Sequence, residues 1–130
     1  MGKLICITID CAKPAQLARD WSAAIDGYAI RPYDEAEVQR LREAGIPDIE
    51  DDPTVAIDAE GLPTIFLQKV PEPKTVKNRV HLDMAVPDVE AEVQSLLGQG
   101  ATRFRDVTEG GNTWTIMQDP EGDEFCVSQA

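Results

Sequence analysis

The sequence predicts an α+β fold made of two β-α-β-β-β units. Short alternating apolar runs mark several strands, and the order strand, helix and roughly three strands occurs twice along the 130 residues. A proline-containing segment, residues 71–74, separates the two halves as an extended, semi-rigid linker. The halves also match weakly in residue pattern, with Cys6 corresponding to His81 and Gly27 to Gly100. We therefore interpret the chain as an internal repeat.

In the first half, apolar residues alternate over residues 4–9 and predict a strand. A helix is expected from Pro14, whose missing N–H is tolerated at a helix start, to Gly27, which suits a C-terminal cap. The other expected elements are a strand at 28–31, a polar helix at 34–44, and strands at 54–58 and 64–70.

The second half opens with a predicted strand over residues 78–85, which contains His81, the only histidine of the chain. A helix is expected to begin at Pro87 and Asp88 and to end near Gly98. The remaining expected elements are strands at 101–107, 113–118 and 124–128, with a hairpin signal at 110–112 and a turn at 119–122.

The length of 130 residues suits a single domain with one core. We predict one domain over residues 1–130, with module one at 1–72 and module two at 77–130. Residues of about 32–53 have no counterpart in the second half, and we interpret them as an inserted acidic helix and loop.

The charge balance is strongly acidic, with 24 Asp and Glu against 12 Lys and Arg and a formal net charge of −12. Nucleic acid and anionic membrane surfaces need a basic footprint, so neither is an expected partner. Apolar runs are too short to span a bilayer, and the N-terminus lacks the pattern of a signal peptide. Three cysteines without metal-type spacing are expected to be reduced thiols, which favours a cytoplasmic protein.

Strand periodicity predicts which residues turn away from the helices. The helices offer Trp21, Ile25, Val93 and Leu97, so the most apolar strand faces are expected to meet them, including Trp114 and Ile116. The opposite faces are then mixed in character. Their candidate site residues are Cys6, Thr8, Phe66, Gln68, Arg79, His81, Asp83, Thr115, Met117, Glu124 and Cys126. These faces either contact water or line a small-molecule pocket, and Cys, Phe and Met favour the pocket.

The segment His81-Leu82-Asp83-Met84 and the terminal stretch from Trp114 to Val127 resemble the vicinal oxygen chelate superfamily, also called the glyoxalase/bleomycin resistance/dioxygenase superfamily. Within it, the chain is most similar to the glyoxalase-like domain branch. The resemblance covers nearly the whole chain and implies that the two modules form an incomplete eight-stranded barrel around a cavity. It also implies that the protein is a homodimer.

In members with a catalytic metal, the resemblance places ligands on the first and last strand of each module. The corresponding residues here are Cys6, His81, Phe66 or Gln68, and Cys126. Only His81 matches the usual His, Gln or Glu ligands, so we expect no metal, although a divalent ion is possible with this incomplete set. Two thiolates and an imidazole could instead hold zinc, or Cys6 and Cys126 could be small wall residues of a pocket.

Three functions are compatible with these features. The first is a metal-dependent lyase or dioxygenase, the second is a metal-free protein that binds a small organic ligand, and the third is a structural or regulatory dimer with a vestigial cavity. We favour the second, with His81 and Glu124 as the candidate catalytic residues and Asp83 as another partner for His81. Arg79 and Lys77 precede His81, so an anionic ligand group is expected.

Overall fold

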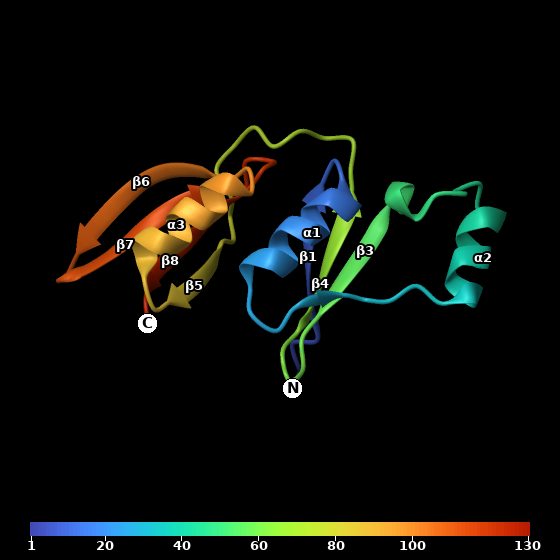
Figure 1. Cartoon of the computed structure of the whole chain (residues 1–130), viewed down its shortest axis with the longest axis horizontal. Coiled ribbons are helices and arrows are strands. Elements are labelled where there is room, and N and C mark those ends of the chain that lie inside the picture. The colour runs from blue at the N-terminus through green and yellow to red at the C-terminus, as the bar shows by residue number, and fades with distance from the viewer. The chain divides into compact units, whose positions relative to one another are not determined.

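The computed structural model describes all 130 residues as two compact units, Met1–Pro73 and Lys74–Ala130. Each unit contains a four-stranded sheet, and one helix packs on a face of that sheet (Figure 1). The boundary between the two units lies within the expected linker, residues 71–74. The mixed α+β class and the repeated β-α-β-β-β order are confirmed.

Unit one contains seven elements. In chain order they are β1 (Cys6–Cys11), α1 (Pro14–Ala24), β2 (Ala29–Ile30), α2 (Glu35–Glu43), the 3-10 helix η1 (Ile49–Asp51), β3 (Thr54–Asp58) and β4 (Thr64–Lys69). The sheet order is β1-β4-β3-β2. β1 and β4 are parallel, and the other neighbours are antiparallel. The first and last strands of the unit therefore lie side by side.

Helix α1 covers one face of this sheet and forms the core of unit one. Pro14 occupies the first turn as expected, and Leu17, Ala18 and Trp21 are buried. They pack above the buried strand residues Val55, Ile57, Ile65 and Leu67. Alternation along β3 and β4 places these four residues on one face, so burying that face is the main stabilising contribution to the unit.

Polar contacts hold the insertion between β2 and β3 together, and an ion pair between Arg19 and Glu50 at 2.7 Å joins it to α1. Asp34 caps α2 by accepting a hydrogen bond from the Glu37 amide at 2.8 Å. The Tyr33 hydroxyl donates to Asp52 at 2.7 Å, and Asp52 is 3% exposed. The acidic run 50–52 is therefore not a fully solvated loop, since its last carboxylate is buried and paired.

Unit two contains β5 (Leu82–Val86), α3 (Val89–Gly98), β6 (Thr102–Glu109), β7 (Asn112–Gln118) and β8 (Glu124–Gln129). The sheet order is β5-β8-β7-β6, with β5 and β8 parallel. Gly110 and Gly111 both have positive φ and form the predicted two-residue hairpin between β6 and β7. Sheet two thus repeats the strand order of sheet one.

Two local expectations for unit two are wrong. The strand predicted at 78–85 begins only at Leu82, and Val80 is 74% exposed instead of facing the helix. On α3 the buried residues are Val93 and Leu96, while Leu97 is 37% exposed. Leu97 follows Leu96 by one residue, and one residue turns a side chain by about 100° around the helix axis. Leu97 therefore lies outside the stripe of side chains that faces the sheet.

The expected orientation of β7 is also wrong. Thr115 lies opposite Val127 and Met117 opposite Phe125, so these residues share the face that α3 covers. Trp114 and Ile116 lie opposite Ser128 and Cys126 on the other face. The Thr115 hydroxyl is satisfied there, because it donates to the Asp106 carboxylate at 2.8 Å.

One of the two outer strands of each sheet is irregular or short. β2 contains two residues. β6 has a register shift between Arg103 and Arg105, where Phe104 is 57% exposed. A bulge of this kind bends and twists the strand locally.

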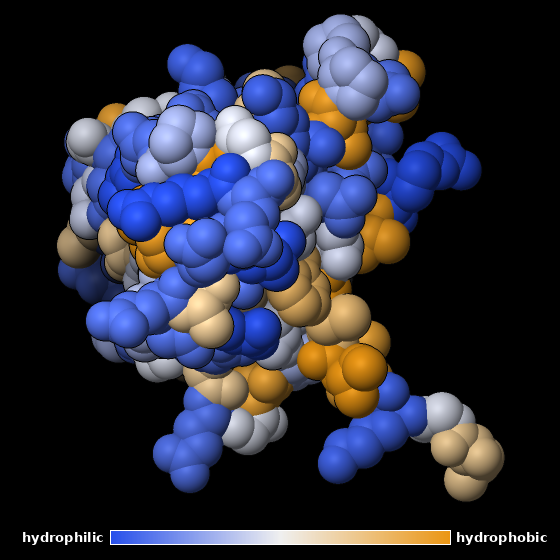
Figure 2. All heavy atoms as spheres, turned by 90° about the vertical axis from the view of Figure 1, so that its right-hand side faces the viewer, coloured by the Kyte–Doolittle hydropathy of each residue, from blue (hydrophilic) through white to orange (hydrophobic).

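None of the three α-helices is long and apolar enough to cross a membrane. Figure 2 shows that hydrophilic side chains dominate the face of the molecule that carries α2, with apolar side chains in small separate groups.

We predict that Met117→Ala lowers the free energy of unfolding by about 2–4 kcal/mol, because it leaves a cavity where the side chain is 0% exposed. Ile116→Ala, on the opposite face and only half-buried, should cost less. Urea unfolding of both variants measures the difference. A larger loss for Ile116→Ala would contradict the face assignment of β7.

Candidate functional site

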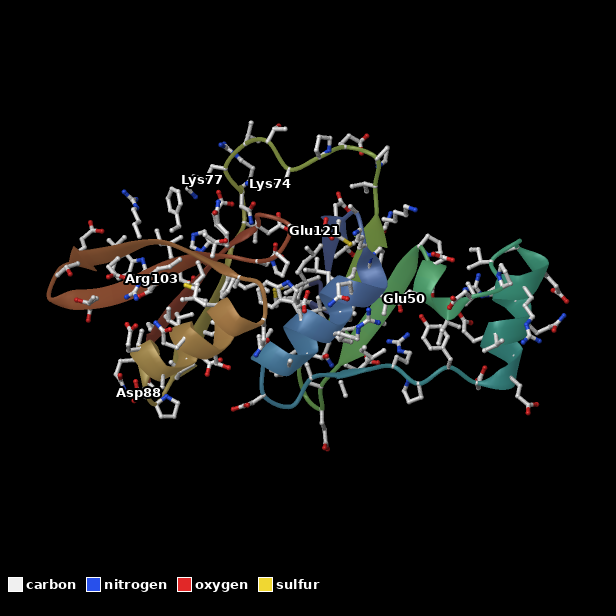
Figure 3. The ribbon with its side chains drawn as sticks, turned by 45° about the horizontal axis from the view of Figure 1, so that its top comes forward. Glu50, Lys74, Lys77, Asp88, Arg103 and Glu121 are labelled. Atoms are coloured by element: carbon white, nitrogen blue, oxygen red, sulfur yellow. The ribbon has the colours of Figure 1, made fainter.

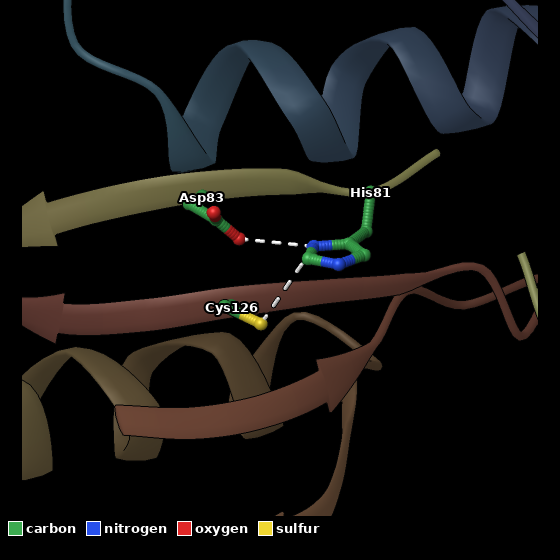
Figure 4. A group of neighbouring side chains, drawn as sticks. All are labelled: His81, Asp83 and Cys126. Carbon is green, nitrogen blue, oxygen red and sulfur yellow. Dashed lines mark hydrogen bonds and ion pairs between the residues drawn. The ribbon is translucent and has the colours of Figure 1, made fainter. Parts of the chain in front are cut away.

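Three polar side chains of unit two converge on the sheet face opposite α3. His81 Nδ1 lies 3.1 Å from Asp83 Oδ1 and 4.0 Å from Cys126 Sγ (Figure 4). His81 and Asp83 lie two residues apart, and Asp83 pairs in register with Cys126 across β5 and β8. The parallel pairing of first and last strand therefore assembles the cluster.

The Cys126 thiol is 8% exposed, and its pKa is raised to about 11. Burial is the main cause, and the hydrogen bond and charge of Asp83 add to it, while Lys77 acts in the opposite direction. The thiol is therefore protonated near neutral pH and is not an activated nucleophile.

The geometry does not form a Cys-His-Asp relay. Such a relay needs the carboxylate on one ring nitrogen and the nucleophile on the other. Here the carboxylate and the thiol both approach Nδ1 of His81. Nε2 has no hydrogen-bond partner within the chain, and it carries no dashed line in Figure 4.

A cavity of about 760 Å³ opens over this cluster. Its polar and aromatic lining comes from β8, from the residue before β5, from β5 itself, and from the β6–β7 hairpin. The lining residues are His81, Asp83, Gly111, Asn112, Thr113, Trp114, Cys126, Ser128 and Gln129. The volume lies within the range of small-molecule sites.

Six of the nine lining residues were not among the predicted site residues: Gly111, Asn112, Thr113, Trp114, Ser128 and Gln129. Trp114 has the largest side chain of the six. Its large apolar side chain predicted a core position, but strand register places it with Ser128 on the cavity face. No signal in the strand itself separates the two faces, because Trp, Ile, Thr and Met alternate without a clearly polar set. Only the pairing with β8 decides the orientation.

Glu124 lies outside the cavity lining and has a different set of contacts. Its carboxylate accepts a hydrogen bond from the Asn78 amide at 3.1 Å and forms an ion pair with Lys74 at 3.1 Å. Figure 3 places Lys74 on the segment that precedes β5. Glu124 thus fastens this segment to β8 and fixes the chain a few residues before His81.

The other predicted site residues of unit two do not join the cluster. Arg79 is exposed and does not line the cavity. Thr115 and Met117 lie on the face covered by α3, at 3% and 0% exposure. The structure therefore brings together His81, Asp83 and Cys126 and separates them from these three residues.

In unit one, register places Cys6 and Thr8 on the same face as Phe66 and Gln68, as expected. A second cavity, of about 340 Å³, lies on this face between β3, β4 and the start of the insertion. Phe66 lines it, with the Arg31 guanidinium 5.7 Å above its ring. Cys6, Thr8 and Gln68 do not line this cavity, and their roles stay predictions.

The residues at the four metal-ligand positions do not fit the set implied by the resemblance. Phe66 has no donor atom, whereas Gln68, the alternative at that position, offers an amide oxygen. Cys6 and Cys126 replace oxygen or nitrogen donors with sulfur. A different set lies within unit two. The donor atoms of His81, Asp83 and Cys126 all lie within 4.8 Å of one another and could hold an ion.

The end of β7 is connected to β8 by the predicted tight turn. Asp119 Oδ1 accepts hydrogen bonds from the amides of Glu121 and Asp123 at 2.8 and 3.0 Å. Burial, and then the Asp119 charge, raise the pKa of Asp123 to about 6. Lys74 opposes this effect.

The model of a family described as glyoxalase-like domain matches residues 6–128. None of the curated proteins matches the chain significantly. Solved structures, by contrast, match over nearly the full length at low sequence identity.

Three of these structures illustrate the likeness. The hypothetical protein SA1046 from S. aureus is 15% identical, with a TM-score of 0.66 over 100% of this chain and 98% of that one. A glyoxalase/bleomycin resistance protein/dioxygenase family enzyme from Burkholderia phytofirmans PsJN is 15% identical, with a TM-score of 0.66 over 98% of each chain. TnmS3, an antibiotic binding protein from Streptomyces sp. CB03234, is 13% identical, with a TM-score of 0.59 over 99% of this chain and 96% of that one. At these identities the likeness shows the fold.

We predict that Asp123→Asn gains stability relative to the parent as pH rises from about 4 to 7. The raised pKa means that the folded state binds the proton more tightly than the unfolded state, so this contribution is lost as pH rises through about 6. Because the group is partly exposed, we expect a relative gain of about 1 kcal/mol.

Urea unfolding of both proteins at several pH values measures this gain. Glu109→Gln, which removes the same charge from an exposed position, is the control and should show a flatter difference. A constant difference between Asp123→Asn and the parent would contradict the assignment.

Proposed function

Because the chain belongs to the glyoxalase-like domain family, we propose that it binds a small organic molecule in the cavity of unit two. The observation that carries the proposal is the convergence of His81, Asp83 and Cys126 beneath a cavity that Trp114 also lines. Ligand sites combine apolar or aromatic surface with convergent polar groups, and here Trp114 supplies the aromatic surface.

The lining indicates the kind of ligand. Trp114 offers an aromatic surface for a planar ring. Hydroxyl and amide groups of Thr113, Asn112 and Ser128 offer neutral hydrogen-bonding partners. Asp83 is the carboxylate of the lining, whereas Arg79, the expected partner of an anion, is absent from it. We therefore propose a planar, uncharged ligand in place of an anionic one.

Related proteins support binding without naming the ligand. TnmS3 is described as an antibiotic binding protein, which is one use of this fold for small organic molecules. A fold of this kind hosts several functions, so the ligand must be found from the site. Sequestration of a planar compound is the form of binding that we propose.

No disulfide joins the three cysteines, and we propose a reducing compartment such as the cytoplasm. We also propose that the protein is a homodimer, as the resemblance to its superfamily implies. Analytical ultracentrifugation measures that assembly directly.

We predict that a panel of planar hydroxyaromatic compounds contains binders that raise the thermal melting temperature. Trp114→Leu should weaken their binding about tenfold or more, since it removes the stacking surface. Phe104→Leu, an exposed aromatic of the same unit, is the matched control and should bind as the parent does. Isothermal titration calorimetry gives the affinities.

Two results would contradict the proposed function. One is the absence of a melting shift with every compound of the panel. The other is equal affinity of the parent and Trp114→Leu, which would place the ligand elsewhere.

A second candidate is a metal centre formed by His81, Asp83 and Cys126. Nitrogen, oxygen and sulfur donors within 4.8 Å of one another suit zinc, with a further position left for water or a ligand. This candidate predicts that the purified protein binds about one Zn²⁺ per chain.

Cobalt substitution tests this candidate without an activity assay. Thiolate-to-cobalt absorption should appear in the parent and in Cys6→Ser, and should be lost in Cys126→Ser. Absence of the band in the parent would exclude the cluster as a site for this type of ion.

A further inference from the structure

The second ring nitrogen of His81, Nε2, has no partner within the chain and is open to solvent, and its protonation state decides which ligand groups it can bind. Asp83 Oδ1 lies 3.1 Å from Nδ1, within hydrogen-bond distance. An ionised carboxylate only accepts hydrogen bonds, so this contact requires a proton on Nδ1. In a neutral imidazole the proton on one nitrogen leaves a lone pair on the other.

We propose that Asp83 positions the His81 imidazole in its Nδ1–H tautomer, so that Nε2 accepts a hydrogen bond from an O–H or N–H group of the ligand. The ligand class that follows is a planar phenol, enol or amide. The proposed ligand class rests on the proposed binding function, whereas the tautomer of His81 is a property of the free protein.

The surroundings of the pair support a fixed arrangement. Asp83 sits two residues after His81 on the same side of the chain, and β8 holds Cys126 beside both. The Asp83 carboxylate also acts on the Cys126 thiol, whose pKa it raises through a hydrogen bond and its charge. Before His81, the contacts of Glu124 with Lys74 and Asn78 restrain the backbone.

The exposure of the ring leaves Nε2 open to a bound molecule. The His81 side chain is 43% exposed and lines the cavity. A carboxylate placed there would face the lone pair of Nε2 and the nearby charge of Asp83. A neutral hydrogen-bond donor is repelled neither by the Nε2 lone pair nor by the Asp83 charge. An aromatic donor can also stack on Trp114.

The single histidine makes the tautomer directly measurable. We expect long-range ¹H–¹⁵N spectra of histidine-labelled protein at about pH 8 to show a protonated Nδ1 and an unprotonated Nε2. Asp83→Ala should abolish this preference. Asp83→Asn should retain it, because the amide oxygen still accepts the hydrogen bond.

Asp88→Asn is the control for loss of a charge in the same unit, because Asn also caps a helix. It should leave the ring signals unchanged. A protonated Nε2 in the parent, a doubly protonated ring at this pH, or ring signals that change when EDTA removes a metal would each overturn the tautomer assignment.

The ligand half is tested with three probes of matching shape: 1-naphthol, 1-methoxynaphthalene and 1-naphthoate. Calorimetry should give the tightest binding for 1-naphthol, with the ether and the carboxylate each about tenfold weaker or more. Asp83→Ala should reduce the advantage of the naphthol over the ether.

The outcomes separate the two levels of the proposal. Equal binding of naphthol and ether would overturn the hydrogen bond to Nε2 while leaving the binding function intact. Absence of binding by all three probes overturns the ligand class, and the ring spectra still decide the role of Asp83.

Discussion

The parallel pairing of the first and last strands within each unit is the constraint on which the site depends. A parallel pair cannot be closed by a tight turn, so the chain must cross over the sheet, and here a helix does so. The helix then covers one face and leaves the other face available. In unit two this pairing puts Asp83 opposite Cys126 and brings the only histidine to the edge of the same face.

Most of the fold was predictable because its signals are local. Alternation located the strands within one or two residues, as at Thr54–Asp58, and Pro14 and Asp88 marked helix starts. The hairpin at Gly110 and Gly111 follows from backbone conformations that glycine adopts easily. The start of β5 was not predictable in this way, because the Glu124 carboxylate holds Asn78 outside the ladder from a distant part of the sequence.

The candidate site was only partly predictable, and the reason is long-range register. His81, Asp83 and Cys126 follow from strand parity within β5 and β8, whose faces differ clearly in polarity. The alternation in β7 is ambiguous, since both of its faces are at least half-buried from Trp114 to Gln118. The bond from Thr115 to Asp106 on β6 makes the polar residue acceptable in the core and leaves Trp114 on the other face. That pairing cannot be read from β7 alone.

The outer strands β2 and β6 affect how the protein behaves at high concentration. An unpaired strand edge can recruit another chain, and long, flat, apolar edges are the most prone to do so. β2 is only two residues long, so it offers almost no template. β6 is longer, but its bulge between two arginines interrupts the regular spacing of free amides and carbonyls. The edges at β2 and β6, two of the four sheet edges, are therefore poor starting points for sheet-to-sheet aggregation, although Phe104 is exposed on β6.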